Sequence, residues 1–263
     1  MAITRFHVQF LLSLKASIPE WNSAQSLMDI GEQNWFSPSF TFKNVISVAR
    51  SLNLLIDAKT ESELLSIEDG PQDPFAIAKL FYLHMLGITE YAAIDLHGTR
   101  FAQPWNLNLP YPPSRLFDLV FNLGTTEHIF NQFEVFNTIH KLCKPGGFMV
   151  HSLPQSGGRE HGFFNYHGTV FYDLAVANGY AIRVFTWTGV VEKEGGRKRQ
   201  TARSFTSQRE FLSFIDDTPL SNEGLNVCFQ KTTNAPFICP QQGHSDNSRL
   251  VDEERNKLWQ KHR

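Results

Sequence analysis

The stretch LPQSGGREHGFFNYHGT gathers several groups that could accept a proton. It holds His161, Tyr166 and His167, and His128 lies further upstream in TTEHI. A histidine titrates near neutral pH, so it suits a base that takes a proton from a hydroxyl or an amine. We therefore treat these four residues as candidate catalytic residues. The alternative is structural, with one histidine capping a helix at Thr169 and the rings packing under the loop.

The spacing of the histidine and cysteine residues does not indicate a metal site. Neither His161 nor His167 has a cysteine or aspartate nearby at ligand spacing, so we expect no metal site. Three scattered cysteines, Cys143, Cys228 and Cys239, form no CxxC pair. An odd, scattered set fits a reducing, cytoplasmic compartment better than a disulfide framework.

A second group of polar residues follows apolar segments that read as strands. Asp29 and Gly31 end SLMDIG, Asp95 ends YAAIDL, and Asn122 lies near the end of FDLVFNLG. In an open parallel sheet, ligands bind beyond the carboxyl ends of the strands. An acid at each of the first two strand ends suits a ligand with an ammonium group and ribose hydroxyls, because a carboxylate accepts hydrogen bonds from both.

The elements that must position these residues alternate between strand and helix. This alternation predicts an α/β domain with a largely parallel sheet. Strands are expected at residues 26–30, 91–96, 117–124, 148–154, 181–189 and 225–231, with a further short strand at the start of FAQPWNLNLPYPPS, before its proline-rich loop. Helices are expected at residues 42–55, 75–86, 125–143 (with Thr125 or Thr126 as N-cap), 169–178 (closed by Gly179) and 207–217. ESELLSIEDGPQDP and EGGRKRQ read as connections, because glycine, proline and charged residues dominate them.

Composition narrows the class of protein. The chain has 263 residues, a hydrophobic fraction of 41% and a formal net charge of −2, so no electrostatic argument favours nucleic acid or an anionic membrane as partner. The basic run at 197–199 reads as a solvated loop. The apolar run HVQFLLSL is far shorter than the ~20 residues that span a membrane, so a helix is expected there. No Walker loop and no GxGxxG motif is present.

Four motifs, taken in order, resemble a known family. LMDIG, AAIDL, FDLVFNLGTTEHI and LCKPGGFMVHSLP are similar to the motifs of class I S-adenosylmethionine-dependent methyltransferases, over roughly residues 24–232. The resemblance implies a Rossmann-like, mostly parallel, seven-stranded sheet with helices on both faces. We expect an N-terminal helix in residues 1–23, a helical insertion at about 36–88 and a C-terminal extension at 233–263.

The resemblance also implies a set of cofactor-binding residues. Asp29, Gly31 and Glu32 match the loop near the methionine portion of S-adenosylmethionine, and Asp95 matches the acid that binds the ribose hydroxyls. Asn106 falls where the family often has an aspartate beside the adenine. The full expected set is Asp29, Gly31, Glu32, Asp95, Asn106, Leu107, Asn122 and Gly124.

Two departures from the family pattern matter. Glu32, Gln33 and Asn34 follow Gly31, where further glycines would let the backbone approach a ligand. Asp29 and Asp95 are 66 positions apart, whereas a βαβ unit takes about 30 residues. We expect Glu32 to contact the amino group of the cofactor and the inserted helices to form a wall of the site.

The predicted function is methyl transfer from S-adenosylmethionine to an oxygen or nitrogen of a small organic acceptor. No nucleic-acid or membrane partner is expected, and the oligomeric state stays open. The alternative is a decayed methyltransferase-like fold that binds a cofactor or a partner without turnover, which the glycine-poor loop favours. An NAD enzyme is disfavoured, because the phosphate loop is missing. APFICPQQG either covers the pocket or lies on the surface, and the polar tail after it forms a helix or is partly disordered.

Overall fold

One large sheet organises the molecule. The structure is a computed structural model, and it describes residues 2–36, 40–67, 73–157, 161–193, 197–216 and 223–243. In these ranges eight strands form the sheet, in the order β5-β4-β2-β6-β7-β10-β8-β9. Their bounds are β2 Ser26–Ile30, β4 Glu90–Ile94, β5 Ala102–Gln103, β6 Phe117–Leu123, β7 Cys143–Ser156, β8 Tyr180–Lys193, β9 Arg197–Ser204 and β10 Glu223–Lys231.

Strand directions confirm the predicted mixed, mostly parallel sheet. β2 pairs in parallel with β4 and β6, β4 with β5, and β6 with β7. β10 is antiparallel to both β7 and β8 and lies between them. The prediction of seven strands and of a loop at EGGRKRQ was wrong in one respect. Residues 197–204 pair antiparallel with β8 and form an eighth strand. Pairing with β8 provides hydrogen-bond partners for their backbone N–H and C=O groups, even though many of their side chains are charged.

The central strands are buried on both faces, which explains their composition. All five residues of β2 and six of the seven residues of β6 are buried. Strands covered on both faces read as continuous apolar runs rather than alternating ones. This is why SLMDI and FDLVFNL were recognisable as strands from the sequence.

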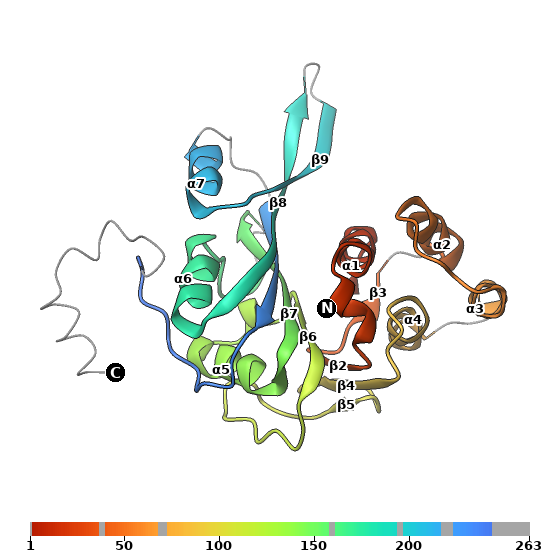
Figure 1. Cartoon of the computed structure of the whole chain (residues 1–263), viewed down its shortest axis with the longest axis horizontal. Coiled ribbons are helices and arrows are strands. Elements are labelled where there is room, and N and C mark those ends of the chain that lie inside the picture. The colour runs from red at the N-terminus through yellow and green to blue at the C-terminus, as the bar shows by residue number, and fades with distance from the viewer. Residues whose placement is uncertain are drawn as a thin grey trace, which may run out of the picture.

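Helices cover the two faces separately (Figure 1). One face carries the N-terminal helices α1 Arg5–Ser17, η1 Pro19–Ser23, α2 Phe42–Ser51, α3 Ala58–Ser66, α4 Pro74–Leu80 and η3 Phe81–Met85. The other carries α5 Gln132–Leu142, α6 Thr169–Asn178 and α7 Gln208–Asp216. Each face has its own hydrophobic core, one around Trp21 and Phe121 and one around Phe171 and Phe229.

Several helix boundaries differ from the sequence-based expectation, for example at α5 and α3. The helix expected to begin at Thr125 or Thr126 is a short 3₁₀ turn, η4 Thr126–His128, and α5 begins only after Asn131. The Thr126 side chain is held by Asn122, whereas Asn131 accepts a hydrogen bond from the Glu134 amide and caps α5. The acidic stretch expected as a connection partly forms α3, because Asp57 accepts a hydrogen bond from the Thr60 amide.

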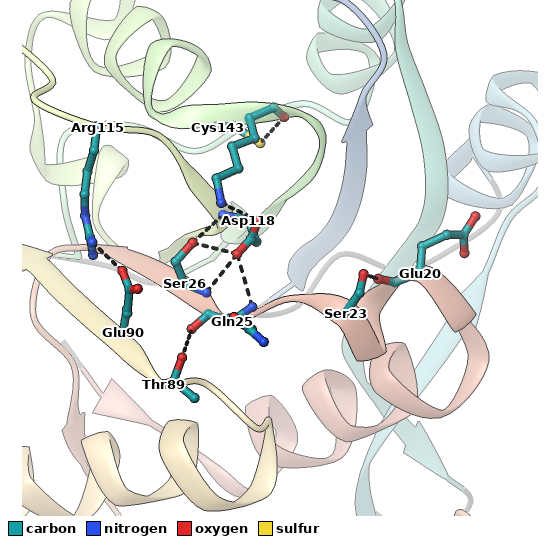
Figure 2. Close-up of polar contacts among 10 residues, drawn as sticks. Glu20, Ser23, Gln25, Ser26, Thr89, Glu90, Arg115, Asp118 and Cys143 are labelled. Carbon is teal, nitrogen blue, oxygen red and sulfur yellow. Dashed lines mark hydrogen bonds and ion pairs between the residues drawn. The ribbon is translucent and has the colours of Figure 1, made fainter.

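The amino end of the sheet is fastened by one carboxylate, Asp118 of β6 (Figure 2). It accepts hydrogen bonds from the Ser26 amide at 2.9 Å, the Ser26 hydroxyl at 2.7 Å and the Lys144 ammonium at 2.7 Å. Burial alone would raise the pKa of Asp118, but the hydrogen bonds from Lys144 and Ser26 lower it to about 2. Asp118 therefore ties β2, β6 and the start of β7 together.

The N-terminal segment crosses the opposite, carboxyl end of the sheet. β1 Ala2–Ile3 pairs in parallel with β3 Asn34–Trp35, directly after the loop that follows β2. His7 Nε2 lies 3.0 Å from the Ser152 hydroxyl near the carboxyl end of β7. Burial lowers the pKa of His7 to about 4, so this imidazole is neutral at physiological pH. The first turn of α1 thus covers part of the edge where ligands bind in such sheets.

APFICPQQG lies against the helices of the second face rather than over the carboxyl edge. Asn178 of α6 exchanges hydrogen bonds with Ile238, and the Gly243 amide donates to Asp173 at 3.0 Å. The tail expected to be helical or disordered lies outside the described residues. In the described ranges, no helix has the length and apolar character needed to cross a membrane.

Candidate functional site at the carboxyl edge of the sheet

The segment from the end of β2 to the start of β3 holds three buried side-chain oxygen atoms that accept no hydrogen bond. They belong to Asp29, Gln33 and Asn34. Asp29 is fully buried, and its other oxygen is approached by the hydroxyls of Tyr82 at 3.3 Å and Tyr91 at 3.4 Å. Burial raises the pKa of Asp29 well above its usual range, against the hydrogen bonds from Gln33 and the tyrosines. A donor-rich group, such as an ammonium, would satisfy these oxygens.

Glu32 is engaged within the protein. Its carboxylate accepts hydrogen bonds from the Thr99 amide at 2.5 Å and the Thr99 hydroxyl at 2.7 Å, and the residue is buried. The backbone at Gly98 lies close to this pair, since a Cβ there would meet Glu32 Oε2 at 3.0 Å and Asp95 Cβ at 2.9 Å. Glu32 therefore joins the β2 loop to the β4 loop, a role that sequence reasoning missed.

Asp95 lies between these two loops. Its carboxylate accepts the amide of Glu32 at 3.0 Å on one oxygen and the amide of His97 at 2.8 Å on the other. Each carboxylate oxygen has two lone pairs, so each can accept one more donor, such as a ribose hydroxyl. Gly31 has a φ of 79°, which a side chain would strain, and its amide donates to the Ile94 carbonyl.

Asn106, expected beside the adenine, and Leu107, expected to bind the cofactor, lie in different surroundings. Asn106 is exposed, and its side-chain oxygen accepts from the amide and the side chain of Asn108, both at 3.0 Å. Leu107 is buried in the core of the second face. Asn106 therefore stabilises its own turn, while Leu107 anchors that turn to the core.

The end of β6 reaches the β2 loop directly. The Thr125 hydroxyl donates to the Ile30 carbonyl, and the buried Asn122 side chain bonds Thr126 and the His151 ring. Gly124, with a φ of 80°, permits the sharp turn between them. This turn places Thr125, directly before η4, beside the end of β2.

Glu127, His128 and His161 form a cluster at this turn. Nε2 of His161 lies 3.4 Å from Glu127 Oε1, and Nε2 of His128 lies 3.9 Å from the same oxygen. The Glu127 side chain is fully buried, whereas His128 and His161 are 42% and 55% exposed. Burial raises the pKa of Glu127, and burial together with the charge of His161 lowers the pKa of His128.

The loop that carries His161 is bound to the backbone of Glu127. The amides of Phe163 and Phe164 both donate to the Glu127 carbonyl, at 2.7 and 3.2 Å. Gly162 packs so closely that an added Cβ would meet Glu127 Cγ at 2.9 Å. The sequence signal for Glu127 was its place beside His128 in TTEHI, but its burial is visible only in the structure.

His167 and Tyr166 take structural positions. The His167 ring lies 3.0 Å from the Thr169 hydroxyl and accepts the Thr169 amide at the start of α6. Tyr166 is 6% exposed, and its hydroxyl donates to Gln132 at 2.7 Å. Burial raises its pKa. Neither residue belongs to the Glu127, His128 and His161 cluster.

Two surface hollows lie elsewhere, one beside Arg203 and Glu210 and one between α6 and β8. Neither contains a residue of the carboxyl edge. Between the β2 and β4 loops, the Glu32 carboxylate is hydrogen-bonded to Thr99.

The chain was compared with protein families, curated proteins and solved structures. No protein-family model matches the chain, and no curated protein matches its sequence. Among solved structures, the N-methyltransferase NodS from Bradyrhizobium japonicum WM9 is 14% identical, with 87% of this chain and 96% of that one covered and a TM-score of 0.43. An O-methyltransferase from a trans-AT PKS multienzyme of Brevibacillus brevis, in complex with S-adenosyl-L-homocysteine, is 10% identical, with coverage of 88% and 73% and a TM-score of 0.39.

A third neighbour is the 1,6-didemethyltoxoflavin-N1-methyltransferase of Burkholderia thailandensis, 11% identical, with coverage of 86% and 79% and a TM-score of 0.34. Scores and identities this low carry no argument about activity, so the fold class rests on the sheet of the chain itself. That sheet is mixed and mostly parallel, with helices on both faces, so the fold is Rossmann-like. The predicted fold class is thereby confirmed.

Proposed function

We propose that the chain transfers a methyl group from S-adenosylmethionine to an oxygen or nitrogen of a small organic acceptor. The observation that carries this proposal is the set of unpaired acceptor oxygens on Asp29, Gln33 and Asn34, in the segment whose Glu32 amide donates to Asp95. These oxygens suit the ammonium group and the ribose hydroxyls of that cofactor, so the residues fit the group even without the usual glycines.

The residues of the chain would then divide the work. The β2 loop would hold the amino acid end of the cofactor, and Asp95 would hold the ribose. S-adenosylmethionine supplies an activated sulfonium methyl, so the protein has mainly to align the acceptor and exclude water. N-terminal residues help with that exclusion, because β1 and His7 cover this edge.

The acceptor side of the proposed site is the cluster beside Gly124. A hydroxyl or amine acceptor loses a proton on methylation, and His161 is exposed enough to receive it. His128 is the second candidate, and the lowered pKa keeps it neutral and able to accept a proton at pH 7. His167 and Tyr166 remain weaker candidates, since both are engaged with neighbouring residues.

Calorimetric titration with S-adenosylmethionine and S-adenosylhomocysteine tests the proposal. We expect both to bind, and Asp95→Ala to weaken binding by about 1.5–3 kcal/mol, since hydrogen bonds to charged groups contribute that much. Asn106→Ala is the matched control with no expected change, because Asn106 bonds only within its own turn in this structure. Absence of binding by both ligands would contradict the proposal.

A second function is favoured by one observation. Both oxygens of the Glu32 carboxylate accept hydrogen bonds from Thr99, so this side chain already has a role in holding the β2 and β4 loops together. A decayed fold that binds a partner without turnover would retain such a closed loop. Tight cofactor binding without methylation of any hydroxyl or amine acceptor would favour this alternative.

A further inference from the structure

Three side chains at the carboxyl edge present ligand atoms toward one point. Glu127, His128 and His161 each offer one nitrogen or oxygen, and these atoms all lie within 4.8 Å of one another. Both Nε2 atoms approach the same Glu127 oxygen, at 3.4 and 3.9 Å. In a tetrahedral site with bonds of ~2.0–2.1 Å, neighbouring ligand atoms lie roughly 3.4 Å apart. The spacing is therefore close to the one that a small cation requires.

Among the described residues, the Glu127 carboxylate makes no hydrogen bond. Its side chain is 0% exposed, and neither oxygen makes a hydrogen bond in the structure. Its distance from His161 permits an ion pair, but a single imidazole leaves the second oxygen unsatisfied. Burying a carboxylate is costly unless it is paired or coordinates a metal. A bound cation would provide the missing interaction.

The backbone fixes the relative positions of the three ligands. His128 directly follows Glu127 in η4, whereas His161 comes from the loop after β7. That loop is fastened to the Glu127 carbonyl by the amides of Phe163 and Phe164. The ligands thus come from two segments that hydrogen bonds hold together, as in a site formed by the fold.

We propose that Glu127, His128 and His161 bind a divalent transition-metal ion. Two imidazoles and one carboxylate form the ligand set of catalytic zinc sites, which keep an open fourth position. Magnesium prefers oxygen ligands and is disfavoured here. The half-exposed histidines leave one side of the cluster open to solvent. Where the proposed function holds, the open position would take an oxygen of the acceptor, and the cation would replace His161 as the group that meets it.

The proposal reverses the expectation from the sequence, which was that no metal site exists. That expectation considered spacing along the chain, and His161 has no ligand-type partner at a suitable spacing there. Glu127 becomes its neighbour only because β6 and β7 are adjacent strands with parallel directions.

Cobalt provides the test, because a tetrahedral Co²⁺ site absorbs visible light. The full chain is stripped with a chelator, desalted and titrated with Co²⁺ alone, and Zn²⁺ is then added in competition. We expect one equivalent of Co²⁺ to bind with visible absorption bands, and Zn²⁺ to displace it. His161→Ala and His128→Ala should each weaken binding at least tenfold.

The matched control is His167→Ala, which removes a nearby exposed histidine outside the cluster and should leave binding unchanged. Because His161 is half exposed, its variant should remain folded, and circular dichroism checks this. No Co²⁺ or Zn²⁺ binding, or binding that survives both cluster variants, would overturn the proposal. The titration contains no S-adenosylmethionine, so its failure would leave the proposed methyl transfer standing.

Discussion

Gly162 shows how a single residue can decide the geometry of the site. Its φ is 74°, and an added Cβ would meet the Cγ and the carbonyl oxygen of Glu127, both at 2.9 Å. A methyl group there must push the His161 loop away from Glu127. The loop, the two amides on the Glu127 carbonyl and the position of His161 would all be affected.

We expect Gly162→Ala to lower the free energy of unfolding by about 1–2 kcal/mol through the left-handed backbone, plus about 1–3 kcal/mol for overpacking. Chemical denaturation measures both contributions together. Co²⁺ binding by the variant should be weakened as well, since His161 would shift.

Gly146→Ala separates the two contributions. Gly146 has a φ of 83°, and nothing lies within 4 Å of a Cβ placed there, so only the backbone cost applies. This control should lose about 1–2 kcal/mol and keep its Co²⁺ affinity. An equal loss in the two variants would show that the contact between Gly162 and Glu127 does not constrain the loop.

Among the elements, β6 joins the two ends of the sheet. Its second residue, Asp118, fastens the amino end, and the turn after its last residue carries Glu127 and His128, which His161 approaches from the loop after β7. Rigid strands position side chains more precisely than loops do. A substitution that weakens the Asp118 hydrogen bonds should therefore weaken the attachment of β2, β6 and β7 to one another.

Asp118→Asn should destabilise the protein in a pH-dependent way. The pKa of Asp118 is lowered to about 2 in the folded state, so its contribution is present above pH 4 and is lost as the pH falls toward 2. At pH 7 we expect a loss of about 1 kcal/mol, allowing for solvent screening of this partly exposed group. Urea denaturation at several pH values should show the two proteins converging near pH 2.

The matched control is Glu90→Gln at the same end of the sheet (Figure 2). Glu90 pairs with Arg115, and both side chains are about half exposed. Exposed pairs contribute about 0–1 kcal/mol, so this change should have little effect at any pH. If Asp118→Asn behaved like Glu90→Gln, the carboxylate would not be what fastens the strands.

The elements also show what the sequence could and could not predict. Buried strands such as β2 and β6 were recognisable because both faces are covered and the apolar run is continuous. The start of α5 was misplaced by several residues, since threonine and asparagine both cap helices and only tertiary contacts engaged Thr126 elsewhere. The cluster could not be assembled from the sequence, because Glu127 and His161 meet through strand order.

Across the whole molecule, the sheet separates two hydrophobic cores. Trp21 of η1 is fully buried in the first, with its ring 6.0 Å from Phe121 and 5.5 Å from Phe148. It connects the N-terminal segment to the middle of the sheet. β1 and His7 cover the carboxyl edge, and we expect their position to depend on the packing of Trp21, which lies away from that edge.

We expect Trp21→Ala to lower the free energy of unfolding by about 3–5 kcal/mol, the usual range for a large buried aromatic residue. Val176→Ala on α6 is the control, because Val176 is 58% exposed and should change stability by no more than about 0.5 kcal/mol. Urea denaturation of both variants provides the measurement. A loss below 1 kcal/mol for Trp21→Ala would mean that η1 does not anchor the segment.

The place of β10 has a consequence for synthesis on the ribosome. β7 and β8 are paired only through β10, whose residues 223–231 emerge long after both. Until then the nascent chain carries unpaired strand edges, which are templates for aggregation. Among the described strands, the sheet is therefore completed only when β10 has been synthesised, and chains truncated before residue 223 should be insoluble.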